Sequence, residues 1–204
     1  MRFLEVKNKL GDLVVFTAKD IRKINPDFFD SRLTKWQEKN YIKKIIKGYY
    51  IFSDTEINEL TLFAIANQIY SPSYISLDSA FRYYNLIPEE VFTVTSVSTR
   101  KTQEFNTDLG NFQYQSIKEE LYRGYKVIGE KEKKFKIATM EKAIVDYFYL
   151  NPSIKTKEDF KGIRFNLDSL EKLDRDQLKK YTQLINKKAV SKRINNFLNY
   201  LKNA

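Results

Sequence analysis

Hydrophobic and polar positions recur with helical spacing over two short segments near the start of the chain. Thr17 and Asp20 are spaced as a capping box, which predicts that a helix starts at Thr17. Pro26 ends this helix, because the residue before a proline is disfavoured in the helical region. Asp30 or Ser31 then caps a second helix. The apolar side chains of the second helix are spaced by four and three residues and predict one inward-facing stripe: Phe29, Leu33 and Trp36.

A β-hairpin is predicted directly after the second helix. Residues 41–46 and 49–52 are rich in β-branched and aromatic side chains, and Lys47-Gly48 between them is a turn signal. Two helices followed by a hairpin is the order of a winged helix-turn-helix, which places one helix in the major groove of DNA. We therefore expect residues 1–54 to form a winged helix-turn-helix domain with a lead-in helix over residues 1–12. Its core is expected to contain Phe28, Phe29 and Trp36.

The central region, residues 55–152, mixes helix and strand patterns. Ser53 and Glu56 form a second capping box, which predicts a helix that runs to about Ile69 and is apolar around most of its circumference. Helices are also expected over residues 79–84 and 139–150. Extended segments are expected at residues 74–76, 92–99, 111–115, 125–128 and 134–137. The predicted fold class is therefore α+β, with a small, mainly antiparallel sheet in this domain.

Residues 153–204 are predicted to form a helical, basic C-terminal region that packs on or extends the second domain. Thr156 with Asp159, and Asp168 with Glu171, supply capping signals ahead of helices that run to the end of the chain. Cationic side chains alternate here with apolar ones: Lys179, Lys180, Lys187, Lys188, Lys192 and Arg193. The ordinary interpretation is the solvated side of amphipathic helices, and the alternative is a second surface for nucleic acid or for a toxin.

Charge is distributed unevenly along the 204 residues, whose net charge is +10. Residues 1–52 carry 12 basic and 6 acidic side chains, residues 53–152 carry 11 and 14, and residues 153–204 carry 13 and 6. A positive charge can serve solubility alone, but its concentration on a DNA-reading shape favours a polyanionic partner.

Cysteine and histidine are both absent from the sequence. No disulfide can form, which fits a reducing compartment, and zinc sites, thiol nucleophiles and histidine-based triads are excluded. The sequence contains no signal-peptide pattern and no stretch apolar enough to suggest a membrane span. We expect a cytoplasmic protein with no cofactor, no metal site, no membrane partner and no small-molecule substrate.

Two groups of side chains are the candidates for contact with double-stranded DNA. The second helix supplies Ser31, Arg32, Thr34, Lys35 and Lys39, and the hairpin supplies Lys43, Lys44, Lys47 and Tyr49. Arg binds guanine in a bidentate manner, and lysines along a wing suit phosphate contacts. The competing interpretations are a solvated helix face and an edge strand that lysines protect from aggregation.

Several short motifs follow one another between residues 15 and 150. They are Gly48-Tyr49-Tyr50, Tyr74-Ile75-Ser76, Ser79-Ala80-Phe81, Asn85-Leu86-Ile87-Pro88, the strand Val94 to Thr99 with Arg100, and Ala138 to Asp146. In this order they resemble the AbiEi family of antitoxins, the transcription-regulator half of type IV toxin–antitoxin (abortive infection) operons. The Asn-Leu-Ile-Pro turn departs from the Gly-Leu turn usual in the family, and residues 153–204 match no part of it.

The resemblance implies two activities. The N-terminal domain would bind inverted repeats in the promoter of its own operon and repress it. The remainder would counter a nucleotidyltransferase-like toxin, and in a type IV system the antitoxin need not bind that toxin directly. This second activity is implied by the resemblance alone.

Two other functions compete with this one. The first is a Mg²⁺-dependent nuclease with an appended winged-helix domain, for which Glu141, Lys142 and Asp146 supply the residue types. Adjacent residues on a helix point about 100° apart, and a two-carboxylate site would need Asp78 or Asp108 as well. We expect no catalytic residue, and expect Glu141 or Lys142, with Asp146, to hold the helix against the sheet instead. The second is a winged domain that serves protein contact alone, which a neutral second helix would suit better.

Overall fold

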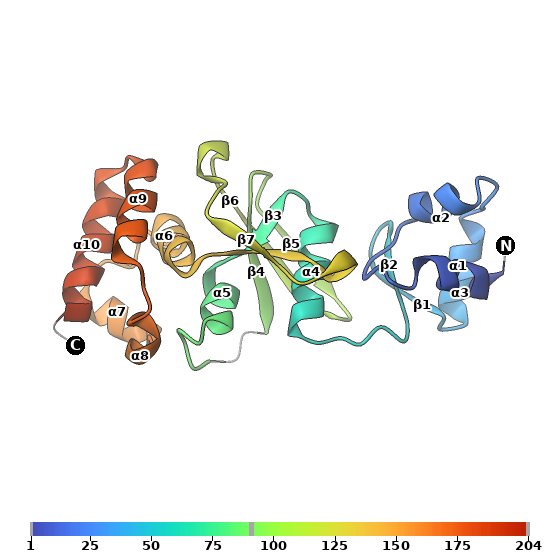
Figure 1. Ribbon diagram of the computed structural model, residues 1–204, viewed down its shortest axis with the longest axis horizontal. Helices are drawn as coiled ribbons and strands as arrows, with labels where there is room; N and C mark the ends of the chain where they lie inside the picture. The colour runs from blue at the N-terminus through green and yellow to red at the C-terminus, as the bar shows by residue number, and fades with distance from the viewer. Residues whose placement is uncertain (1, 90–91, 203–204) are drawn as a thin grey trace.

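The computed structural model describes residues 2–89 and 92–202 and shows a mixed α+β protein. In these residues the chain forms ten α-helices, a two-stranded antiparallel sheet and a six-stranded mixed sheet. The molecule is elongated (Figure 1): three N-terminal helices lie at one end, the larger sheet lies in the middle, and the C-terminal helices lie at the other end. None of the described helices is both long enough and apolar enough to cross a bilayer.

The N-terminal unit consists of helices α1 (Phe3–Leu10), α2 (Ala18–Ile24) and α3 (Ser31–Glu38) and strands β1 (Ile42–Ile46) and β2 (Tyr49–Phe52). The predicted capping box at Thr17 is present, with the Thr17 side chain accepting from the Asp20 backbone N–H. The predicted hairpin is also present, and Gly48 in its turn has a φ of 87°, which favours glycine. Phe16 extends the hairpin, because its backbone exchanges two 2.9 Å hydrogen bonds with Tyr50.

A separate hydrophobic cluster holds this unit together. Leu33 and Trp36 are buried as the spacing predicts, and Phe28 packs against Trp36 with their ring centroids 5.5 Å apart. The prediction that Phe29 is buried is wrong, because its side chain is 69% exposed. Helix α3 begins only at Ser31, so Phe29 precedes the helix and does not share the inward stripe of Leu33 and Trp36.

The central sheet has the strand order β5-β6-β4-β3-β8-β7. Its strands are β3 (Ser73–Ile75), β4 (Thr93–Ser98), β5 (Gln103–Thr107), β6 (Gly110–Ser116), β7 (Tyr125–Ile128) and β8 (Phe135–Ala138). Three neighbouring pairs are antiparallel and two are parallel, so the sheet is mixed and larger than the sequence predicts. The sequence does not predict strand β5, because its residues are mostly polar. It is an edge strand and needs little apolar surface.

Helices cover both faces of this sheet. Helix α4 (Glu59–Ile69) packs on the face that carries Tyr114, whose hydroxyl donates to the Ala66 carbonyl at 2.8 Å. Helices α5 (Leu77–Tyr83) and α6 (Met140–Leu150) cover the opposite face, on which Tyr74 lies. The predicted helix start at Ser53 is wrong, because Asn58 caps α4 by accepting from the Thr61 backbone N–H at 2.9 Å. Two 3₁₀ turns, Glu119–Leu121 and Lys131–Lys133, flank β7.

The described part of the C-terminal region is helical and consists of α7 (Lys157–Ile163), α8 (Leu167–Leu170), α9 (Arg175–Ile185) and α10 (Lys188–Lys202). Helices α9 and α10 pack on α6, and apolar side chains of this region join the central cluster. The capping box of Thr156 and Asp159 is present. The predicted pairing of Asp168 with Glu171 is wrong, because the side chain of Asn166 caps α8 instead. The predicted continuation beyond residue 202 lies outside the described residues.

The two adjacent phenylalanines before α3 allow a matched test of this packing. We expect Phe28→Ala to lower the free energy of unfolding by about 3–5 kcal/mol, because it empties a buried aromatic site. Phe29→Ala should change it by no more than about 0.5 kcal/mol, since the ring is mostly exposed. Urea unfolding followed by the fluorescence of Trp36, the single tryptophan, measures both. Equal losses for the two variants would contradict the assignment.

Candidate nucleic-acid interface

The side of α3 that turns away from the N-terminal core is cationic and polar. The five side chains predicted to contact DNA from this helix are all exposed: Ser31, Arg32, Thr34, Lys35 and Lys39. Leu33 and Trp36 of the same helix are buried, which fixes the rotation of the helix about its axis. Glu38 is exposed on the same helix and offsets part of the positive charge. The structure therefore brings four of these candidates together on α3, with Lys39 at its C-cap.

The start of α3 is held by backbone and side-chain contacts that differ from the prediction. Asp30 occupies the N-cap position, but its side chain makes no capping hydrogen bond. Its carboxylate instead forms an ion pair with Arg22 of α2. The Arg32 backbone N–H donates to the Phe29 carbonyl at 3.1 Å, which closes the first turn. Arg32 thus lies at the N-terminal end of α3.

The hairpin candidates lie on more than one side of the protein. Lys43, Lys44 and Lys47 are exposed. Lys43 is paired across the hairpin with Ile51, whereas Lys44 is paired with Tyr50, so the two lysines project from opposite faces.

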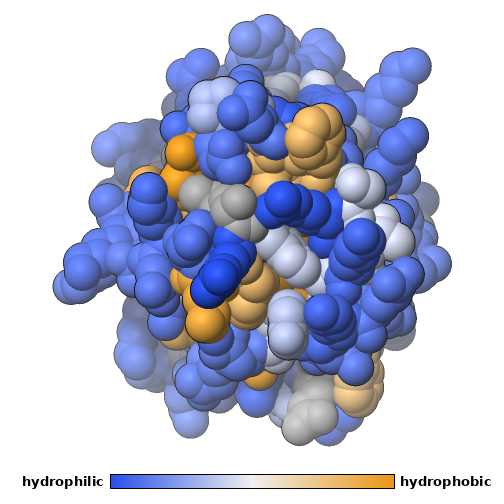
Figure 2. All heavy atoms as spheres, turned by 90° about the vertical axis from the view of Figure 1, so that its right-hand side faces the viewer, coloured by the Kyte–Doolittle hydropathy of each residue, from blue (hydrophilic) through white to orange (hydrophobic). Residues whose placement is uncertain are grey.

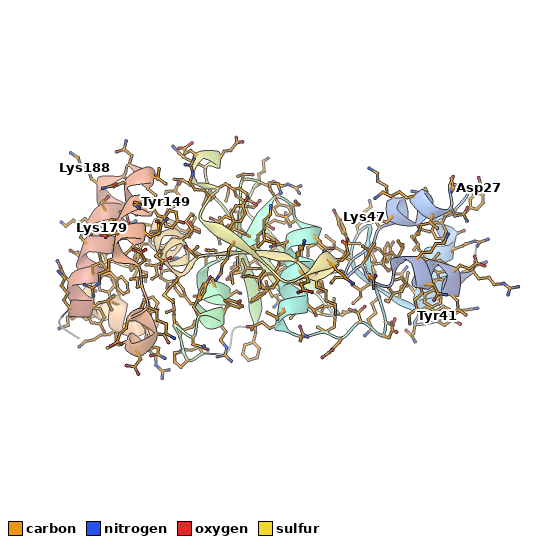
Figure 3. All side chains as sticks on the ribbon, in the orientation of Figure 1. Asp27, Tyr41, Lys47, Tyr149, Lys179 and Lys188 are labelled. Atoms are coloured by element: carbon orange, nitrogen blue, oxygen red, sulfur yellow. The ribbon has the colours of Figure 1, made fainter. Side chains whose placement is uncertain are left out.

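Tyr49 and Lys47 lie on the side of the N-terminal unit nearer the central sheet. Tyr49 is half-buried against the central hydrophobic cluster. Figure 3 places Lys47 on the side of the unit that faces the central sheet, with Asp27 toward the far end. Figure 2 shows the outer end of the unit, which is mostly hydrophilic with small hydrophobic patches. The α3 candidates thus share one exposed helix surface, whereas Lys43 and Lys44 lie on opposite faces of the hairpin.

A buried polar cluster joins α6 to the central sheet. Lys142 and Asp146 of α6 form an ion pair, and their side chains are 4% and 3% exposed. The Asp146 carboxylate accepts from the Tyr74 hydroxyl at 2.9 Å and from the Ser76 hydroxyl at 2.9 Å. The Lys142 ammonium also donates to the Tyr74 hydroxyl at 2.8 Å. Burial, followed by the charge of Asp146, raises the pKa of Tyr74 well above its usual value.

This cluster accounts for residues that the nuclease alternative would need. Asp146 is engaged by three side chains, and the Glu141 carboxylate accepts from the Asp174 backbone N–H at 3.1 Å, which holds the start of α9. Burial raises the pKa of Asp78 in α5, and Asp108 lies in the turn between β5 and β6. Within residues 2–89 and 92–202, no group of three or more acidic side chains is placed to hold a metal ion.

The roles of Tyr74 and Ser76 were missed by the sequence analysis, although a signal exists. They alternate with Ile75, so they share one face of a short buried strand. Two polar groups on a buried face require hydrogen-bond partners, and α6 provides them.

Tyr122 lies beside this cluster without joining it. Its ring centroid is 5.2 Å from that of Tyr74, but its buried hydroxyl has no hydrogen-bond partner among the described residues. Burial, with a contribution from Tyr125, raises the pKa of Tyr122 to about 12. The two tyrosines therefore differ in hydrogen bonding while sharing one environment.

That difference gives a second matched test. Tyr74→Phe should lower the free energy of unfolding by about 1–3 kcal/mol, because it leaves the buried Lys142 and Asp146 each short of a partner. Tyr122→Phe should leave it unchanged or raise it slightly, since no hydrogen bond is lost. Urea unfolding followed by circular dichroism measures both variants. A larger loss for Tyr122→Phe than for Tyr74→Phe would contradict the hydrogen-bond assignment.

The chain matches no protein-family model, and the search of curated proteins finds no match. The functional interpretation therefore depends on the chain's own residues and geometry.

Proposed function

We propose that the protein is a DNA-binding transcriptional autorepressor, whose N-terminal unit is a winged helix-turn-helix with α3 as the recognition helix. The observation that carries this proposal is the cationic surface of α3, where Arg32, Lys35 and the C-cap residue Lys39 are exposed while Leu33 and Trp36 are buried. A helix presented in this way can enter the major groove with its N-terminal residues at the base edges. Arg32 lies at that end of the helix.

The order of elements around α3 supports the same proposal. A strand-like bridge at Phe16 precedes α2, and α3 is followed by the β1–β2 hairpin, to which Phe16 is bonded through Tyr50. This gives a helix, a bridge, two helices and a hairpin, which is the order of a winged helix. The hairpin turn, Lys47-Gly48, is short, so the wing offers few residues to the DNA backbone. We therefore assign base reading to α3 and phosphate contacts mainly to lysines.

We further propose that the protein acts as the antitoxin of a type IV toxin–antitoxin system and counters a nucleotidyltransferase-like toxin. The support is the ordered set of motifs that resemble the AbiEi family, from Gly48-Tyr49-Tyr50 to the segment Ala138 to Asp146. Two of these motifs meet in space, because Tyr74 and Ser76 bind Lys142 and Asp146. Such contact gives motifs distant in sequence a shared structural role in the central domain.

DNA binding is tested with a duplex from the region upstream of the protein's own gene. Arg32→Ala should weaken binding by about 1–3 kcal/mol through loss of a guanine contact. Lys35→Ala should weaken it on all sequences and reduce the salt slope by about 0.9. If about five phosphates are contacted, the slope of log K against log salt for the unmodified protein is near −4.5. Fluorescence anisotropy at several salt concentrations measures these quantities.

The control is Lys101→Ala, which removes the same charge from an exposed position in the loop between β4 and β5. It should bind as the unmodified protein does. The assignment of α3 is wrong if Arg32→Ala and Lys35→Ala, both folded by circular dichroism, retain full affinity.

Antitoxin activity is tested by co-expression with a neighbouring nucleotidyltransferase-like gene. Expression of that gene alone should arrest growth, and co-expression of this protein should restore it. Arg32→Ala should still restore growth when expressed from an unrelated promoter, because the activity is assigned to the central domain. Growth arrest that persists at matched protein levels would overturn the antitoxin proposal and leave the DNA-binding proposal standing.

A further inference from the structure

The two phenylalanines that precede α3 have opposite environments. Phe28 is 4% exposed and packs on Trp36, whereas Phe29 is 69% exposed. Within the described residues, no other aromatic ring packs against that of Phe29. Single exposed apolar side chains are common on protein surfaces, so exposure by itself assigns no role. Its position relative to α3 distinguishes Phe29 from other exposed apolar residues.

Phe29 lies at the end of α3 that we propose to read DNA. Its carbonyl accepts the Arg32 backbone N–H at 3.1 Å, so it is one turn away from Arg32 and two residues before Ser31. The exposed ring therefore belongs to the turn that leads into the end of the helix whose side chains are assigned to base edges. A recognition helix that enters the major groove by this end carries the ring toward the groove.

The charges around Phe29 favour a base over a phosphate as its neighbour. Asp27 is exposed two residues before it, and Asp30 follows it and is paired with Arg22. Carboxylates at this turn repel the phosphate backbone, whereas base edges carry no net charge. The apolar group that the major groove presents is the C5-methyl of thymine, and phenylalanine is among the side chains that contact it.

We propose that Phe29 is a specificity-determining residue that selects thymine at one position of the DNA site by packing on its C5-methyl group. This inference rests on the proposed DNA-binding function. It adds an apolar contact to the hydrogen bonds of Arg32 and Ser31, and it assigns a sequence preference to a residue outside the helix.

The test selects preferred duplexes from a random library with the unmodified protein and with Phe29→Ala. The unmodified protein should select a site with thymine at a position that Phe29→Ala no longer discriminates. Replacing that thymine by deoxyuridine removes only the methyl group and should weaken binding of the unmodified protein about fourfold. The same replacement should not change the affinity of Phe29→Ala. The control is Leu4→Ala, which truncates a side chain that is 67% exposed on α1 and should retain the preference.

The outcomes separate this inference from the function on which it rests. If the unmodified protein selects no sequence, the proposed DNA-reading function fails. If it selects a site and Phe29→Ala selects the same site with equal affinity, the function stands and the role of Phe29 is overturned. The role is also overturned if the unmodified protein binds the thymine and deoxyuridine duplexes with equal affinity. A lower affinity of Phe29→Ala for both duplexes would then have a cause other than the methyl group. Sedimentation of both proteins at matched concentrations completes the test, because a lower oligomeric state for Phe29→Ala would assign the ring to self-association instead.

Discussion

Each face of the β1–β2 hairpin contributes buried apolar side chains to a different core, and the arrangement of the protein depends on this constraint. Ile42 and Phe52 pack into the N-terminal cluster, whereas Ile45 and Ile51 pack into the central one. An irregularity in the strand register between Lys44 and Ile46 accompanies this change of face. The hairpin therefore contributes residues to both cores. The N-terminal unit is therefore attached to the central sheet by apolar packing as well as by the connecting segment.

The position of the hairpin between the two cores also determines where α3 lies in the molecule. Because the hairpin is held from both sides, it sets the position of α3, which packs against β1 through the N-terminal core. Strand β1 also lies beside β5 at the edge of the central sheet. DNA bound along α3 would meet the outer end of the elongated molecule first (Figure 1). Lys43 and Lys44 of the hairpin project from opposite faces, so they do not form one surface with each other.

Within the central domain, a buried polar cluster attaches a helix to the sheet, where apolar packing is more usual. Helix α6 is buried around most of its circumference, including Lys142 and Asp146, which place charges in the interior. Buried charges are tolerated when they are paired and hydrogen-bonded, and here the strand residues Tyr74 and Ser76 complete the set. These directional contacts fix α6 relative to β3, and helices α9 and α10 pack on α6. Packing contacts thus connect the hairpin, the central sheet, α6 and the last helix.

The sequence alone determined the local elements whose signals are short-range. The capping boxes at Thr17 and Thr156, the Lys47-Gly48 turn and the stripe of Leu33 and Trp36 depend on residues a few positions apart, and each is present. They were sufficient to place the cationic residues of α3 on an outer face.

Only the tertiary structure decided the remainder. Which of the two phenylalanines before α3 enters the core depends on where the helix starts and on the site beside Trp36, and the sequence pattern cannot distinguish them. The polar edge strand β5 is stabilised by backbone pairing with β6, and the amino-acid composition of β5 does not predict this pairing. The contacts of Tyr74 with Lys142 and Asp146 join residues about 70 positions apart. Packing and strand pairing between residues far apart in the sequence decide these three features. Such contacts form only when the chain folds.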